Sequence, residues 1–247
     1  MTTLPNLVSA LSEVDGRDRK SIEHIARVIR EAGYIPKGKR GGGAPEMTPR
    51  EAANLIIALN GADTPKDCPL AIDRFRSLVQ AFSGSAKDFR NYVDSFEDQP
   101  EAMQVAADSH TFGEALEAIL SEVPSLVEAF YRFGKEQFPG KDPAYWDSHL
   151  LGALRIGMFG LSIQFNRYAA SIEVFIMHGS ERKVQSVIQF RQDMNRDEGF
   201  YGNSWPDRRI QSTIGAATLI AAWQAMNPGQ KLPGIRERVS RPEDESE

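Results

Sequence analysis

The sequence predicts an α+β fold in two parts: an N-terminal helical domain, then a helical region with a small antiparallel sheet and a buried C-terminal helix. Three observations predict it. Residues 1–64 alternate short amphipathic segments with turns. Residues 161–191 are rich in β-branched and aromatic side chains in rough alternation, which is typical of strands. Residues 208–226 are apolar nearly all round a helix, which indicates burial.

The N-terminal domain is expected to contain three helices. Residues 5–14 carry apolar side chains at helical spacing, and the Asp-Gly dipeptide after them is a turn signal. Asp18 is placed to cap a second helix, whose apolar positions recur at i, i+3, i+4 and i+7 until Gly33 ends it. A third helix is expected to start after Thr48, because Thr48 and Glu51 have the spacing of a capping box.

Between the second and third helices lies the segment KGKRGGGAPEM, which starts at Lys37. Its glycines tolerate positive φ and let the backbone approach a phosphate closely, while its Lys and Arg side chains supply charge for phosphate contact. We interpret the segment as a basic wing; a flexible surface loop is the alternative. A nucleotide-phosphate loop is disfavoured, because the G-x-x-x-x-G-K-[ST] pattern is absent and no apolar strand precedes the segment.

The order of helix, turn, helix, basic glycine segment and helix is that of a winged helix-turn-helix domain. It predicts that the second helix reads base edges of double-stranded DNA and that the basic segment holds adjacent phosphates. An amphipathic helix with a solvated charged face is the alternative for the helix alone. The predicted DNA-binding residues are Arg17, Arg19, Lys20, Glu23, His24, Arg27, Lys37, Lys39, Arg40, Gly41, Gly42 and Gly43.

Residues 4–60 resemble the winged helix-turn-helix of MerR-type and excisionase-like regulators, in the style common in phage genomes. The resemblance is carried by the EAGYIP segment at the end of the second helix, by the Arg- and Gly-containing wing, and by the helix that follows Thr48. It covers about a quarter of the chain. The first two helices are joined differently here, by DGRD, and the long dimerisation coiled coil of that family is not evident. The resemblance implies DNA binding and no effector class.

The rest of the chain is divided by composition. Residues 62–69 have the character of a linker or a chain reversal, and residues 65–228 are expected to form an α+β domain for self-association or effector binding. Residues 229–247 are expected to be a disordered charged tail.

Periodicity predicts the elements of this second domain. Helices are expected at residues 70–82, 87–96, 111–120 and 124–138. An antiparallel meander is expected from strands at residues 161–168, 171–179 and 183–191, with a hairpin loop at 179–182. The helix at residues 208–226 is expected to be buried in the domain or in a subunit interface.

Charge is sorted along the chain. The net charge is -5, which argues mildly against a protein whose whole surface binds nucleic acid. Residues 15–50 hold nine basic and five acidic side chains, a net charge of +4, whereas residues 94–147 hold three basic and twelve acidic ones, a net charge of -9. A basic N-terminal part and an acidic middle follow from these totals.

The sequence also bounds the compartment. The single cysteine, Cys68, allows no internal disulfide and favours a reducing environment. The first residues lack the pattern of a secretory signal, and no run of apolar residues reaches the length of a membrane span. We therefore expect a cytoplasmic protein with no membrane partner.

Residues of catalytic type do not form a recognised pattern. The four histidines lack metal-ligand spacing, Cys68 has no histidine near it in sequence, and no G-x-S-x-G is present. Asp193, Asp197, Glu198 and Asp207 lie among four arginines, which favours a solvated, ion-paired loop over an acid–base or cation site. We expect no enzyme activity, no cofactor and no metal, and an enzyme that uses this loop is the least favoured alternative.

The function that the sequence favours is sequence-specific double-stranded DNA binding for transcription regulation, with a phage or mobile element as one source. A homodimer or higher homo-oligomer is expected, because proteins with one small reading head commonly dimerise to reach two half-sites. Two alternatives stay open. One is a phage DNA-packaging or recombination accessory protein on an oligomeric ring; the other is a protein-interaction module without DNA affinity.

Overall fold

The computed structural model describes residues 3–38, 44–85, 100–138, 140–166, 168–192 and 211–235. Its fold is mixed α and β, as the sequence predicts. The helices are α1 Leu4–Asp15, α2 Arg19–Glu31, α3 Pro49–Gly61, η1 Pro65–Asp67, α4 Cys68–Arg76, α5 Glu101–Ala107, α6 Phe112–Ser121, α7 Val123–Gln137, α8 Pro143–Arg155 and α9 Ala216–Met226. The strands are β1 Val79–Ser85, β2 Phe159–Asn166, β3 Ala169–His178, β4 Glu181–Arg191 and β5 Gln211–Gly215.

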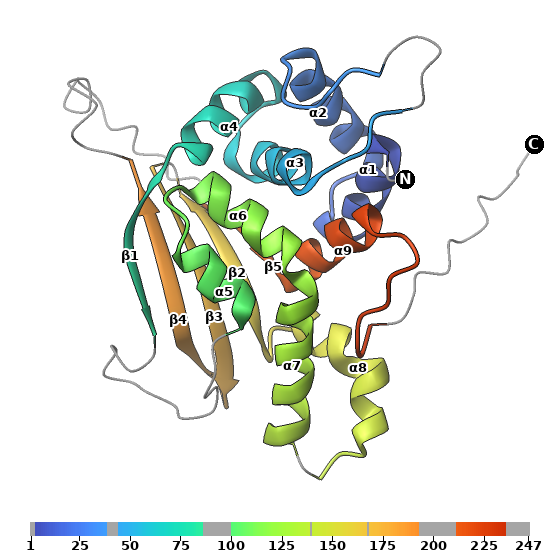
Figure 1. The fold of residues 1–247 in the computed structure, drawn as a ribbon, viewed down its shortest axis with the longest axis vertical. Helices are drawn as coiled ribbons and strands as arrows, with labels where there is room; N and C mark the ends of the chain where they lie inside the picture. Colours follow the sequence, from blue (N-terminus) through green and yellow to red (C-terminus); the bar gives the residue numbers. More distant parts are fainter. Residues whose placement is uncertain are drawn as a thin grey trace, which may run out of the picture.

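These strands form one antiparallel sheet in the order β1-β4-β3-β2-β5. The predicted meander is confirmed as β2, β3 and β4, and its hairpin closes where His178 pairs with Glu181. The helices gather on one side of the sheet (Figure 1). In β2, alternate residues carry the large apolar side chains Phe159, Leu161 and Ile163, which are buried in the core.

A cluster of aromatic rings joins the sheet to the helices. Phe165 of β2 lies with its ring centroid 5.3 Å from that of Phe75 in α4 and 5.6 Å from that of Phe112 in α6. Phe190 of β4 lies 5.5 Å from Phe112. These tilted and edge-to-face contacts are the favoured geometries of aromatic pairs, so they fix α4 and α6 against the sheet.

The hydrophobic core runs through both predicted domains. In α3 every residue from 52 to 60 is buried, and this helix contacts α4, α6 and α9. Helix α1 packs along α9 (Figure 1). A Cβ on Gly61 would lie 2.5 Å from the ring of Phe75, so this glycine allows α3 and α4 to approach closely. The N-terminal helices therefore share their core with the rest of the chain across residue 64.

Two predicted helices are wrong in part. Residues 79–82, taken as the end of a helix, belong to β1, which pairs with β4 from Val79 to Ser85. The segment at 211–215, taken as the first turns of the C-terminal helix, is β5, and α9 begins only at Ala216. Both segments have apolar spacing that fits a helix. They form strands instead, because each pairs with a strand that is distant in the sequence.

Other differences concern residues between the predicted elements. Helix α8 was not predicted. The expected linker at residues 62–69 contains η1 and ends in the core, since Cys68 is fully buried. Leu232 and Ile235 are also buried, so residues 229–235, expected to be disordered, belong to the folded body. Residues 236–247 and the predicted helix at 87–96 lie outside the described residues.

Candidate nucleic-acid interface

Helix α2 buries one face and exposes the other. Ile22, Ile25, Ala26 and Ile29 are buried against α1, α3 and α4, as their i, i+3, i+4, i+7 spacing predicts. The exposed charged and histidine side chains of this helix define the α2 outer face: Arg19, Lys20, Glu23, His24, Arg27, Arg30 and Glu31.

The ends of α2 are fixed by local contacts that the sequence predicts. Asp18 accepts a hydrogen bond from the Ser21 backbone N–H at 2.9 Å. Hydrogen bonds from the Ser21 side chain and then its backbone lower the pKa of Asp18 below its ordinary value. At the other end Gly33 adopts a φ of 93° and the Tyr34 N–H donates to Ile29 O at 2.9 Å. The outer face is thus held in one orientation.

Arg17, a predicted DNA contact, lies in the turn before α2 and is engaged by the protein itself. Its guanidinium pairs with both carboxylate oxygens of Asp15 and donates to the backbone carbonyl of Leu59 in α3. The Asp15 side chain is only 5% exposed. These contacts tie the turn to α3, so we leave Arg17 out of the proposed DNA-contacting set.

The other predicted residues of α2 lie together on the outer face. Arg19 Nε donates to Glu23 Oε1 at 2.9 Å, and His24 Nδ1 lies 3.2 Å from an Arg27 guanidinium nitrogen. Lys20 makes no ion pair or hydrogen bond through its side chain with any part of the chain that the structure describes. The Arg30 side chain likewise has no ion pair or hydrogen bond within the described residues. The predicted DNA-binding set omitted Arg30, although it lies three residues after Arg27 on the same face of the helix.

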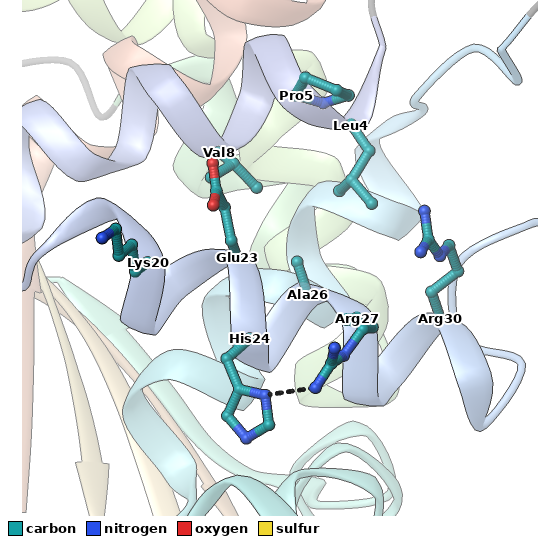
Figure 2. A pocket seen from close by; sticks show the side chains of 9 residues that line it. All are labelled: Leu4, Pro5, Val8, Lys20, Glu23, His24, Ala26, Arg27 and Arg30. Atoms are coloured by element: carbon teal, nitrogen blue, oxygen red, sulfur yellow. Dashed lines mark hydrogen bonds between the residues drawn. The ribbon is translucent and has the colours of Figure 1, made fainter.

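A groove of about 440 Å³ runs between α1 and the α2 outer face. Its apolar floor comes from Leu4, Pro5 and Val8 of α1 and from Ala26 of α2. Figure 2 shows the cationic side chains of α2 along this groove, with Lys20 towards one end of the helix and Arg30 towards the other. On this face Arg19 pairs with Glu23, and Arg27 Nε lies 4.0 Å from Glu31 Oε1. A polyanion that lies along α2 would therefore meet unpaired cations near both ends of the helix, at Lys20 and Arg30, and an apolar surface beside them.

Part of the predicted wing lies outside the described residues, namely Lys39, Arg40, Gly41, Gly42 and Gly43. Lys37 is exposed, and its Nζ donates to Glu31 O at 3.3 Å, at the C-terminal end of α2. Residues 34–38 and 44–48, which lie on either side of residues 39–43, contain no strand. The wing therefore stays a prediction.

Two observations concern metal binding and catalysis in the described residues. Within them, no group of three or more His, Cys, Asp or Glu side chains has the geometry to hold a metal ion. Burial, and then the charge of Asp67, raises the pKa of Cys68 to about 11, which disfavours the nucleophilic thiolate. Asp193, Asp197, Glu198 and Asp207 lie outside the described residues.

Helix α9, one of the segments expected to serve self-association, is buried inside the fold. Seven of its residues, Ala216 and Thr218 to Trp223, are buried, and it contacts α1, α6 and α8. Of the two alternatives for this helix, burial within the domain is the one that the structure shows.

Comparison with protein-family models, with curated proteins and with solved structures gives no match for this chain. Within the part of the chain that the structure describes, no helix combines the length and apolar character that a membrane span requires.

Proposed function

We propose that this protein binds double-stranded DNA through the α2 outer face and acts as a sequence-specific transcription regulator. The 13 residues of α2 form a rod about 20 Å long. Such a helix fits the major groove, which is about 12 Å wide. Arg19, Lys20, Glu23, His24 and Arg27 would then face base edges or the phosphates that border them.

The observation that supports this proposal most strongly is that two cationic side chains on this face are exposed and unpaired. Lys20 and Arg30 are exposed at opposite ends of α2 and have no side-chain partner among the described residues. Helices α1, α3 and α4 pack against the buried face of α2. A ligand could therefore pair with these two cations without any change in the backbone of α2. Phosphates spaced along a duplex are a ligand of matching charge and length.

The remaining surface supports one orientation on DNA. Glu128 and Glu136 of α7 and Asp142 before α8 are exposed and belong to the acidic middle of the chain. Like charges repel a polyanion, so these helices would face away from the duplex. A second copy would supply a second α2 for another half-site, which keeps a homodimer or higher homo-oligomer within the proposal.

The test is fluorescence anisotropy of the full-length chain on duplex DNA from its own upstream region and on a scrambled duplex, over a range of salt concentrations. Lys20→Ala with Arg30→Ala removes the two unpaired cations of α2. Arg132→Ala with Arg155→Ala is the matched control, since it removes two exposed cations from α7 and α8 and leaves the same net charge.

We expect the wild type to prefer its own upstream duplex and to weaken steeply with salt. The α2 pair should make the slope of log affinity against log salt shallower by about 2, with the control slope unchanged. If neither duplex binds at low salt, the proposal is wrong and the α2 outer face is better pursued as a protein-contact surface.

A further inference from the structure

A buried amide connects the end of α2 to the body of the protein. Asn54 of α3 is 3% exposed, and its Nδ2 donates to the backbone carbonyl of Tyr34 at 3.0 Å. Tyr34 lies three residues after the end of α2 at Glu31 and three residues before Lys37. Because residues 52–60 of α3 are all buried, this hydrogen bond attaches the exit of α2 to the interior of the fold.

The other end of the same amide is also engaged. Arg76 of α4 donates to Asn54 Oδ1 at 3.0 Å and forms an ion pair with Glu117 of α6. A Cβ on Gly113 would lie 3.1 Å from the Arg76 backbone, so α6 packs closely against this arginine. We call Tyr34, Asn54, Arg76 and Glu117 the Asn54 network.

A second contact holds Tyr34 from its side chain. Its hydroxyl donates to Asp73 Oδ1 of α4 at 2.6 Å. Burial, and then this hydrogen bond, raises the pKa of Tyr34 to about 12, so the hydroxyl stays protonated and keeps donating at neutral pH. Tyr34 is therefore fixed by its main chain and by its side chain, to two different helices.

We propose that the Asn54 network positions the C-terminal end of α2 and the start of the basic segment at Lys37 for DNA binding. This inference rests on the proposed function. Asn54 and Arg76 are positioning residues: they lie behind α2, and they act through the Tyr34 carbonyl. Losing the network would let Lys37 sample several positions, so its contact with phosphate would weaken.

Helix α3 offers a matched control for this inference. Asn60 is also buried, at 9% exposed, and it also uses both ends of its amide. Its Nδ2 donates to Ile56 O at 2.9 Å, and its Oδ1 accepts from the Ser212 hydroxyl of β5 at 2.8 Å. Asn60 thus connects α3 to the sheet rather than to the exit of α2.

The experiment compares Asn54→Ala and Asn60→Ala in the full-length chain. Three quantities are measured: the urea midpoint of unfolding, the salt slope of duplex binding, and the rate of trypsin cleavage after Lys37 under native conditions. Asn54→Asp is the third variant, because its carboxylate keeps an acceptor for Arg76 and removes the donor to the Tyr34 carbonyl. It serves even if Asn54→Ala does not fold.

We expect both alanine variants to lower the urea midpoint. Only the Asn54 variants should accelerate cleavage after Lys37, by about fivefold. Only they should make the salt slope shallower, by about 1. Equal cleavage rates and equal slopes in the Asn54 and Asn60 variants would overturn the positioning role while leaving DNA binding intact. If the wild type does not bind DNA, the proposed function fails, and the cleavage rates still decide whether Asn54 holds the exit of α2.

Discussion

Helix α2 was expected to contact DNA and helix α9 to be buried in the domain or in a subunit interface, and the fold exposes one face of α2 and buries α9. Helix α2 carries seven charged or histidine side chains on one face, and that face stays in solvent. Helix α9, AATLIAAWQAM, has no charged residue and is buried within the chain. A helix that is apolar on all sides is therefore expected to be buried, although its own sequence does not say which element covers it. A helix that is charged on one side keeps that side exposed to solvent.

The largest effect on stability is expected from a substitution in the buried helix α9. Trp223 of α9 is 4% exposed, and Trp223→Ala would remove a large buried side chain. We expect a loss of about 3–5 kcal/mol in the free energy of unfolding, measured by urea denaturation at two protein concentrations. A variant of unchanged stability that loses only its oligomeric mass would show instead that α9 lies between subunits.

A smaller effect is expected within the N-terminal helices. Arg17→Ala would leave the buried Asp15 carboxylate without its ion pair and Leu59 O without its donor. Because the Arg17 side chain is 37% exposed and solvent screens the pair, we expect a loss of only about 1 kcal/mol in unfolding free energy. The salt slope of DNA binding should stay unchanged.

That outcome separates a structural arginine from a DNA-contacting one. If Arg17→Ala kept full stability and made the salt slope shallower by about 1, Arg17 would contact a phosphate. It would then return to the DNA-contacting set beside Lys20 and Arg30.

Local signals predicted the parts of the fold that local chemistry determines. The Asp18 cap, the Thr48–Glu51 capping box and the positive φ at Gly33 are confirmed, because each depends on residues within one turn of the helix end. The strands of the central meander are confirmed for a similar reason. β1 and β5 were missed, since pairing with strands distant in the sequence stabilises them.

In the candidate site, too, the features set by nearby residues could be predicted, and those set by distant contacts could not. The exposed residues of α2 follow from a period of 3.6, and extending that period would have added Arg30. The Asn54 network and the Arg17 contact with Leu59 join residues 20 to 42 positions apart. No pattern in a single segment predicts such contacts, because they depend on how α3, α4 and α6 pack.

We propose that DNA meets the α2 outer face and not the acidic helices. The most direct test is photo-cross-linking from one introduced cysteine, since Cys68 is buried and does not compete for labelling. Glu31→Cys places the cross-linker on the α2 outer face, and Glu128→Cys places it on α7 with the same change of charge. We predict that duplex DNA cross-links at position 31 and not at position 128. Equal cross-linking yields, or a higher yield at position 128, would contradict DNA binding at the α2 outer face.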